Sequence, residues 1–178
     1  AEKMYLRGIQ GLEAKFGPDH LETLRAVGYL ASLYHYQGKL AEAERMYLHV
    51  LQGEARILGG SHVAVLRTIS DLANLYSHLD KLAKAEEMFL HVQDGYKKAL
   101  GPGELKRYRP ALENLSRLGR LYKKQGRKDE ARSVYLEALE GYEMVYGPSD
   151  PKDRWRKTIV DALYSLDNED KEDDCIVM

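Results

Sequence analysis

The sequence lacks the features of a secreted, disulfide-linked or membrane-spanning protein. Its 178 residues include one cysteine, Cys175, which has no second cysteine with which to form an internal disulfide. This composition fits a reducing compartment, and we expect a cytoplasmic protein. No apolar run approaches the ~20 residues that span a bilayer. Glu2, Lys3 and Arg7 interrupt the first apolar positions, so the opening residues do not resemble a secretory signal.

An excess of charge of one sign is also missing. The chain has 27 Lys and Arg residues against 28 Asp and Glu residues, so no overall field attracts a polyanion. We therefore expect no nucleic-acid partner, and any electrostatic preference must come from local clusters. Proline is scarce, with five residues, and tyrosine, with thirteen, far outnumbers phenylalanine and tryptophan. The composition is typical of a soluble, mostly helical protein.

A fourfold internal repeat organises the chain. The segment 1–6 recurs at 43–48, at 85–90 and, with more changes, at 131–136, at offsets of 42, 42 and 46 residues. A second landmark keeps the same offsets: Leu33-Tyr34, Leu75-Tyr76, Leu121-Tyr122 and Leu163-Tyr164. Chance does not keep independent landmarks in register. The four extra residues of the third interval fall around Glu104 to Tyr108, which predicts an enlarged loop there.

Each repeat has the pattern of two helices. Leu24, Val27, Ala31 and Tyr34 follow the three-and-four spacing of a helix face, and Gly38 then interrupts the pattern. A second helix follows and ends near residues 59–60. We therefore predict an all-α chain of about eight helices, in which antiparallel hairpins stack to bury their apolar faces. The predicted solenoid covers 1–166, with a half repeat at 1–20, repeats at 21–62, 63–108 and 109–150, and a capping helix at 151–166.

Four positions in each repeat resemble the tetratricopeptide repeat, in the long form found in kinesin light chains and in many fungal repeat proteins. The first helix carries a small residue followed by a tyrosine, and the second carries an alanine followed by an aromatic residue. These positions are Ala31, Ala73 and Gly119; Tyr34, Tyr76 and Tyr122; Ala43, Ala85 and Ala131; Tyr47, Phe89 and Tyr135. The resemblance implies a right-handed superhelical solenoid that binds other proteins. Because the sequence opens within a second helix, we expect it to be part of a longer protein.

The resemblance also implies that the first helices line a concave face on which partners lie. The candidate peptide-binding residues on these helices are Arg25, Arg67, Ser70, Asn74, Arg117, Arg120 and Lys123. Guanidinium groups bind carboxylates through paired hydrogen bonds, so the set predicts a basic groove for an acidic or C-terminal peptide. We therefore expect a peptide-binding adaptor or sensor arm. Two alternatives stay open: an ordinary solvated helix face, and a structural module that forms a homo-oligomer.

The six histidines raise the question of a metal site or an active site. His20 and His62 are equivalent, as are His49 and His91, and equivalent positions in successive repeats do not converge on one point. No histidine pair with metal-binding spacing, cysteine pair, phosphate-binding loop or nucleophile elbow is present. We therefore expect no enzyme activity, no cofactor and no metal.

The last twelve residues differ from the repeats in character. Residues 167–174 hold six acidic residues and one lysine, which predicts a flexible tail over 167–178. The final four residues, beginning at Cys175, match a C-a-a-X prenylation signal, whose terminal methionine favours farnesyl. The alternative is a short apolar end without a role. We expect membrane association only if Cys175 is prenylated.

Overall fold

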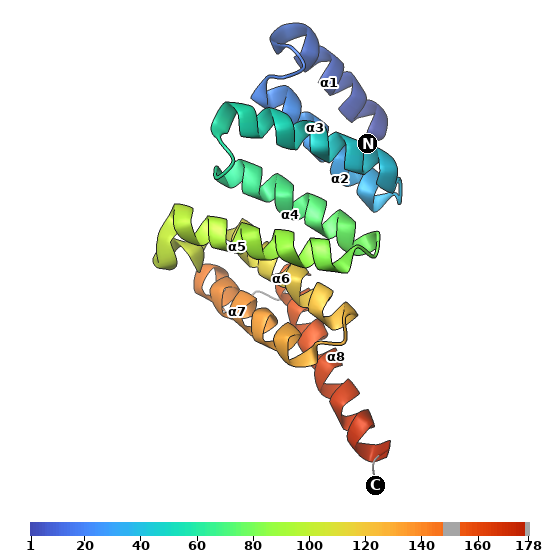
Figure 1. Cartoon of the computed structure of the whole chain (residues 1–178), viewed down its shortest axis with the longest axis vertical. Helices are drawn as coiled ribbons and strands as arrows, with labels where there is room; N and C mark the ends of the chain where they lie inside the picture. The colour runs from blue at the N-terminus through green and yellow to red at the C-terminus, as the bar shows by residue number, and fades with distance from the viewer. Residues whose placement is uncertain (148–153, 177–178) are drawn as a thin grey trace. The chain divides into compact units, whose positions relative to one another are not determined.

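A computed structural model describes residues 1–147 and 154–176, with side chains of the last helix described as far as Asn168. The regular structure in these ranges is helical throughout. The helices are α1 (Glu2–Phe16), α2 (Leu21–Tyr36), α3 (Leu40–Leu58), α4 (Val63–His78), α5 (Leu82–Leu105), α6 (Arg109–Lys124), α7 (Lys128–Tyr146) and α8 (Arg154–Ile176) (Figure 1). The predicted all-α class is thus confirmed. The helices form two compact units, Ala1–Ala99 and Leu100–Met178.

Short turns join the two helices of each hairpin. The α2–α3 turn passes through Gly38 at φ 78°, and the α6–α7 turn passes through Gly126 at φ 75°. A left-handed residue at this place lets the chain reverse directly after a helix, and glycine adopts that conformation without a clash. Asp80 takes the same conformation in the α4–α5 turn, at φ 60°. Each predicted repeat segment therefore contains two helices that can pack side by side.

The core of each hairpin lies where its two helices cross. The small residues Ala31, Ala73 and Gly119 on the first helices are buried, as are the aromatic residues Tyr47, Phe89 and Tyr135 on the second. A β-carbon built on Gly119 would lie 2.7 Å from Cε1 of Tyr135, so the ring occupies the space that an alanine side chain would fill. The absence of a side chain at Gly119 therefore lets the aromatic ring approach the backbone of α6.

The region predicted as an enlarged loop, Glu104 to Tyr108, contains the last residues of α5 and the turn that leads to α6. Helix α5 continues to Leu105, with a break at Gly101, where φ is 74°. Pro102 follows the break, and its fixed φ suits the first turn of a new helical segment. The extra residues of this repeat therefore add a short helical turn before α6 begins at Arg109.

Helix α8 differs from the predicted capping helix at its end. The predicted start at Pro151 lies outside the described residues, and the predicted end lay near Leu166. The helix instead continues to Ile176. The sequence from 154 to 176 contains neither glycine nor proline, the residues that most often end a helix. The end of α8 is thus a correction, while the flexibility of residues 167–178 remains a prediction.

Candidate peptide-binding surface

Four of the predicted binding residues lie in the first unit. Arg25 on α2 is exposed and donates a hydrogen bond from Nη1 to Oε1 of Glu22, one turn earlier, at 3.1 Å. Arg67 and Asn74 on α4 are half-buried. Ser70, also on α4, is only 2% exposed, so its hydroxyl offers a ligand almost no surface. The accessible polar groups of this set are therefore Arg25, Arg67 and Asn74.

The other three predicted residues lie on α6, in the second unit. Arg120 is exposed, while Arg117 and Lys123 are half-buried. Nζ of Lys123 donates a hydrogen bond to Oγ of Ser165 on α8. The pKa of Arg120 is lowered, first because protein atoms displace water around its guanidinium and then because Arg117 places a second positive charge nearby. The structure thus brings two predicted cations together on one helix.

Sequence reasoning missed a contact between two histidines of the first unit. Nε2 of His35, on α2, lies 2.9 Å from Nδ1 of His78, on α4, and the rings meet edge to face. Nδ1 of His78 is also 2.9 Å from the backbone oxygen of Asn74. A carbonyl oxygen can only accept, so this second contact is a hydrogen bond in the tautomer of His78 that carries a proton on Nδ1. The two histidines stand 43 positions apart, whereas equivalent positions of these repeats stand 42 apart. They therefore occupy neighbouring rather than equivalent positions on α2 and α4, and this was the only sign of the contact in the sequence.

The remaining histidines give no sign of a metal site. The ring nitrogens Nδ1 of His20 and His62 accept hydrogen bonds from the backbone amides of Glu22 and Ala64, so both residues cap the start of a first helix. Among the described residues, no group of three or more His, Cys, Asp or Glu side chains could hold a metal ion. The repeated histidines of the linkers therefore have a structural role.

A cation covers the repeated tyrosine near each hairpin turn. Lys39 lies over the ring of Tyr34, and Lys81 lies over that of Tyr76, at 4.6 and 5.0 Å from the ring centroids. Arg127 lies 4.2 Å from the centroid of Tyr122.

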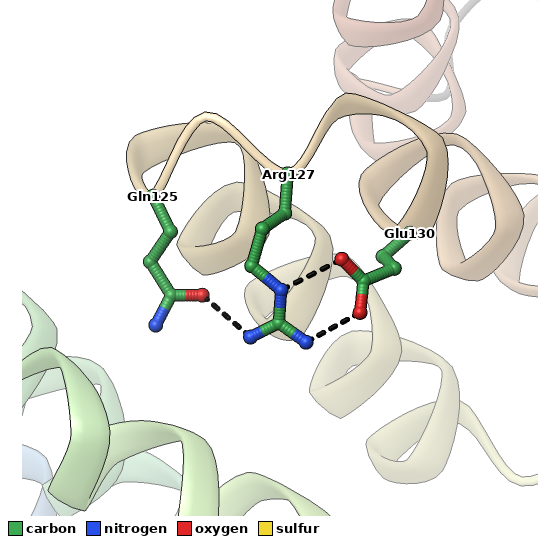
Figure 2. A network of polar contacts seen from close by, with 3 residues as sticks. All are labelled: Gln125, Arg127 and Glu130. Atoms are coloured by element: carbon green, nitrogen blue, oxygen red, sulfur yellow. Dashed lines mark hydrogen bonds and ion pairs between the residues drawn. The ribbon is translucent and has the colours of Figure 1, made fainter.

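Figure 2 shows the Arg127 guanidinium between the side chains of Gln125 and Glu130. It donates to Oε1 of Gln125 at 3.0 Å and makes a paired contact with the carboxylate of Glu130. These contacts, together with the cation over each ring, give the repeated tyrosines a role in packing the hairpins.

Comparison with known proteins agrees with this arrangement. Residues 27–98 match one model of the tetratricopeptide repeat, and residues 115–152 match a second model of the same repeat. Together these ranges cover more than half of the chain. The chain belongs to the tetratricopeptide repeat family. Repeats of this family form protein–protein interaction modules, so this tetratricopeptide chain is a module of that class.

Solved structures show the same fold. The chain is similar to BtubC (BKLC) from P. vanneervenii, with 20% identity and a TM-score of 0.68 over 83% of this chain and 56% of that one. It thus spans little more than half of BtubC. It is also similar to nearly identical TPR-like repeats from Podosopora anserina, described as a kinesin light chain, and to a single-substitution variant of those repeats. Both are 18% identical and cover 96% of this chain and 79% of theirs, with TM-scores of 0.65 and 0.67.

These neighbours confirm the predicted solenoid fold class and the likeness to kinesin light chain repeats. No curated protein matches the tetratricopeptide chain in sequence. Within the described residues, no helix is long and apolar enough to cross a membrane.

Proposed function

We propose that this chain is an adaptor module that binds an acidic or C-terminal peptide through the inner face of its first helices. What supports the proposal is the run of cations on α6, Arg117, Arg120 and Lys123, in a chain whose net charge is only −1. Cations clustered on one helix attract an anionic ligand over short distances. A carboxylate is well suited because it accepts paired hydrogen bonds from a guanidinium group.

The first unit contributes a different chemistry to the proposed face. The charge of Arg25 is already balanced by Glu22, and the half-buried Arg67 and Asn74 add one cation and one amide. Because three of the candidate cations, Arg117, Arg120 and Lys123, lie on α6, we expect that helix to supply most of the preference for acidic ligands. Residues of α2 and α4 would contact the peptide mainly through polar groups and backbone.

A titration with a model ligand tests the proposal. Fluorescein-labelled hexaglutamate at low ionic strength should bind the wild-type chain, and hexaglutamine should not. The double variant Arg67→Ala, Arg120→Ala should bind hexaglutamate at least tenfold more weakly, because each lost charge-assisted hydrogen bond contributes about 1.5 kcal/mol or more. Arg45→Ala is the matched control, since Arg45 is an exposed cation on the second helix α3. Equal affinity in the double variant and the wild type would exclude the proposed groove.

Self-association is the alternative function, and one observation favours it. Tyr5 on α1 is 38% exposed, whereas the equivalent Tyr47 on α3 is 2% exposed, and Met4 beside it is 78% exposed. Exposed apolar side chains of this size pack against another helix, either one that precedes α1 in a longer chain or one of a second copy, and the alternative function takes the second copy. Light scattering over a range of concentrations separates the two functions. Self-association would be supported by a wild-type dimer that does not bind hexaglutamate and that dissociates when Met4 is changed to Glu. A wild-type chain that stays monomeric at all concentrations would exclude self-association.

Prenylation of Cys175 is a further part of the proposal. Cys175 lies in the last turn of α8, beyond the side chains that the structure describes, so prenylation is supported by the C-a-a-X pattern of residues 175–178 alone. A farnesylated protein would be cytoplasmic and would associate weakly with membranes. Mass spectrometry of the chain expressed in eukaryotic cells should show one farnesyl group, absent in Cys175→Ser. An unmodified Cys175 would remove the membrane-associated function.

A further inference from the structure

The histidines of the chain are confined to its first compact unit. Residues 100–178 contain no histidine, and the six that the chain has are His20, His35, His49, His62, His78 and His91. Histidine is the side chain whose charge ordinarily changes between pH 5 and pH 8. A contact that depends on the charge of a histidine can therefore occur in the first unit and not within the second.

Two of these histidines cap the first helices of the first unit. Nδ1 of His20 accepts a hydrogen bond from the backbone amide of Glu22, at 3.3 Å, where α2 begins. Nδ1 of His62 accepts one from the amide of Ala64, at 3.2 Å, where α4 begins. An imidazole nitrogen accepts only while it carries no proton. Protonation therefore removes the cap and also places a positive charge at the positive end of the helix dipole.

Two other histidines join the opposite ends of the same helices. Nε2 of His35, in the last turn of α2, lies 2.9 Å from Nδ1 of His78, in the last turn of α4. One of these two nitrogens must accept, so the contact needs one imidazole that is not fully protonated. A first added proton is tolerated, because a positive charge in the last turn of a helix is favourable. A second proton leaves two donors facing each other and breaks the contact.

The charged groups around the two caps differ. At His20, the carboxylates of Asp19 and Glu22 favour the protonated imidazole, while neighbouring cations oppose it. At His62, Ser61 and Ala64 replace those two acids, so this cap depends mainly on its own proton. The charged groups around His20, directly or through one contact, are Lys15 of α1, Asp19, Glu22 and Arg25, and His49 and Arg56 of α3. Near His62, Lys98 of α5 is equivalent to Arg56 and pairs with Asp94.

The His35–His78 pair lies close to the turns that end the first helices. The charged groups in and beside those turns are Lys39 with Glu2 of α1, Lys81 with Glu44 of α3, Asp71 and Asp80. Each of the two lysines lies against a carboxylate, so its charge is partly balanced before the histidine pair takes up a proton.

We propose that the first unit is a proton-sensitive device, in which mild acid loosens α2 and α4 at both ends. The capping contacts stabilise the fold while the imidazoles are neutral, so their contribution is present above the histidine range and is lost as pH falls through it. The second unit lacks this response. Tyr108 occupies the place of His62 without a capping hydrogen bond from its side chain, and Lys123 occupies the place of His35. The response does not depend on the proposed function, because no ligand takes part.

Hydrogen exchange at pH 7.5 and pH 5.5 tests the proposal, because ordinary carboxyl groups titrate below this range. Protection factors of the α2 and α4 amides should fall about fivefold on acidification, the effect of losing one helix cap of typical strength. Those of α6 and α7 should change far less. Asparagine is a preferred cap that does not titrate, so the double variant His20→Asn, His62→Asn should lose most of this fall while keeping the helices capped. His91→Asn is the matched control, since His91 is exposed on the second helix α5.

The pair between the helix ends is tested by adding His35→Gln to the double variant. Any fall that remains in the double variant should then disappear. Equal protection at the two pH values in the wild type, or an equal fall in both units, would overturn the proposal whatever the variants do. A double variant that keeps the whole wild-type fall, or a His91→Asn variant that loses it, would show that the caps are not the sensor.

Discussion

Single glycines at the helix crossings determine how closely the two helices of each hairpin approach. A β-carbon on Gly53, Gly95 or Gly141 would lie 2.5–2.6 Å from a methyl carbon of Leu24, Leu66 or Leu112 on the facing helix. Gly11 is the equivalent position on α1, and a β-carbon there would have no neighbour within 4 Å. The same residue type at the same repeat position therefore has opposite consequences for substitution.

Alanine substitution at two of these glycines should show that difference. At Gly141 the new methyl group would also lie 2.6 Å from the backbone oxygen of Lys106, which cannot rotate away, so we expect destabilisation of about 1–3 kcal/mol. Gly11→Ala should raise the free energy of unfolding by about 0.5–1 kcal/mol, because alanine favours the helix and meets no clash. Urea unfolding measures both effects. Similar changes for the two variants would contradict the packing described for the crossings.

At this scale the sequence predicted types of residue better than their contacts. The register of the repeats identified Ala31, Ala73 and Gly119 as small crossing residues, because a fixed period of residues repeats a fixed environment. It could not predict that the buried Tyr135 hydroxyl has no hydrogen-bond partner among the described residues. That fact depends on which side chain faces it from α6, and only the folded hairpin brings Arg120 to that place.

Between elements, a small cluster of polar contacts fixes α1 against the end of α2. Oε1 of Glu2 accepts a hydrogen bond from the Tyr34 hydroxyl at 3.0 Å, and Oε2 accepts one from Nζ of Lys39 at 3.1 Å. The hydrogen bond from Lys39 has the larger effect and that from Tyr34 the next, and together they hold the pKa of Glu2 below its usual value of 4.5. Lys81 and Glu44 approach each other at the next turn along, at 3.9 Å. The packing of successive hairpins thus includes a repeated ion pair.

The lowered pKa of Glu2 predicts how α1 responds to acid. The ionised form is favoured in the folded state, so its contribution to stability is present above about pH 4.5 and is lost as pH falls through the lower folded pKa. The protection factors of the α1 amides, which compare observed with intrinsic exchange rates at each pH, should therefore fall on acidification, and NMR titration should place the pKa of the Glu2 carboxyl below 4.5. Glu2→Gln should remove this component of the pH dependence. A Glu2 carboxyl that titrates at or above 4.5 would show that the cluster does not form in solution.

The helices were largely predictable, and the exceptions have physical causes. Apolar periodicity and the turn at Gly38 predicted the hairpins, since these signals are local to a few residues. The end of α8 was placed too early because an acidic composition was given more weight than the absence of helix-breaking residues. The contact between His35 and His78 was missed because it joins two helices whose relative rotation is fixed by packing.

For the molecule as a whole, the proposed function depends on local rather than total charge. The net charge is −1, yet α6 brings Arg117, Arg120, Lys123 and Lys124 close together in sequence. Attraction between such a cluster and an acidic ligand is screened over about 10 Å at 0.1 M salt. Binding of hexaglutamate should therefore weaken steadily as sodium chloride rises from low to high concentration. Affinity that is independent of salt would mean that the ligand is held by apolar contacts instead.

The division into two units allows the location of the ligand to be tested without a complex structure. If the account is correct, the cations of the second unit make the main contribution to recognition, and those of the first unit make a smaller one. The repeats alone do not decide this, since both units have the same architecture. Their side chains differ at the positions that follow the small residue of each first helix.

The most direct test is a map of backbone amide chemical-shift changes on titration with hexaglutamate at low salt. The account predicts that the largest changes fall on α6, around residues 117–124. Smaller changes should reach Arg67 and Asn74 on α4, and the exposed residues of α3 should not respond. Changes concentrated on the second helices α3 and α5, or no saturable change at all, would contradict the claim that this tetratricopeptide chain binds acidic peptides through its first helices.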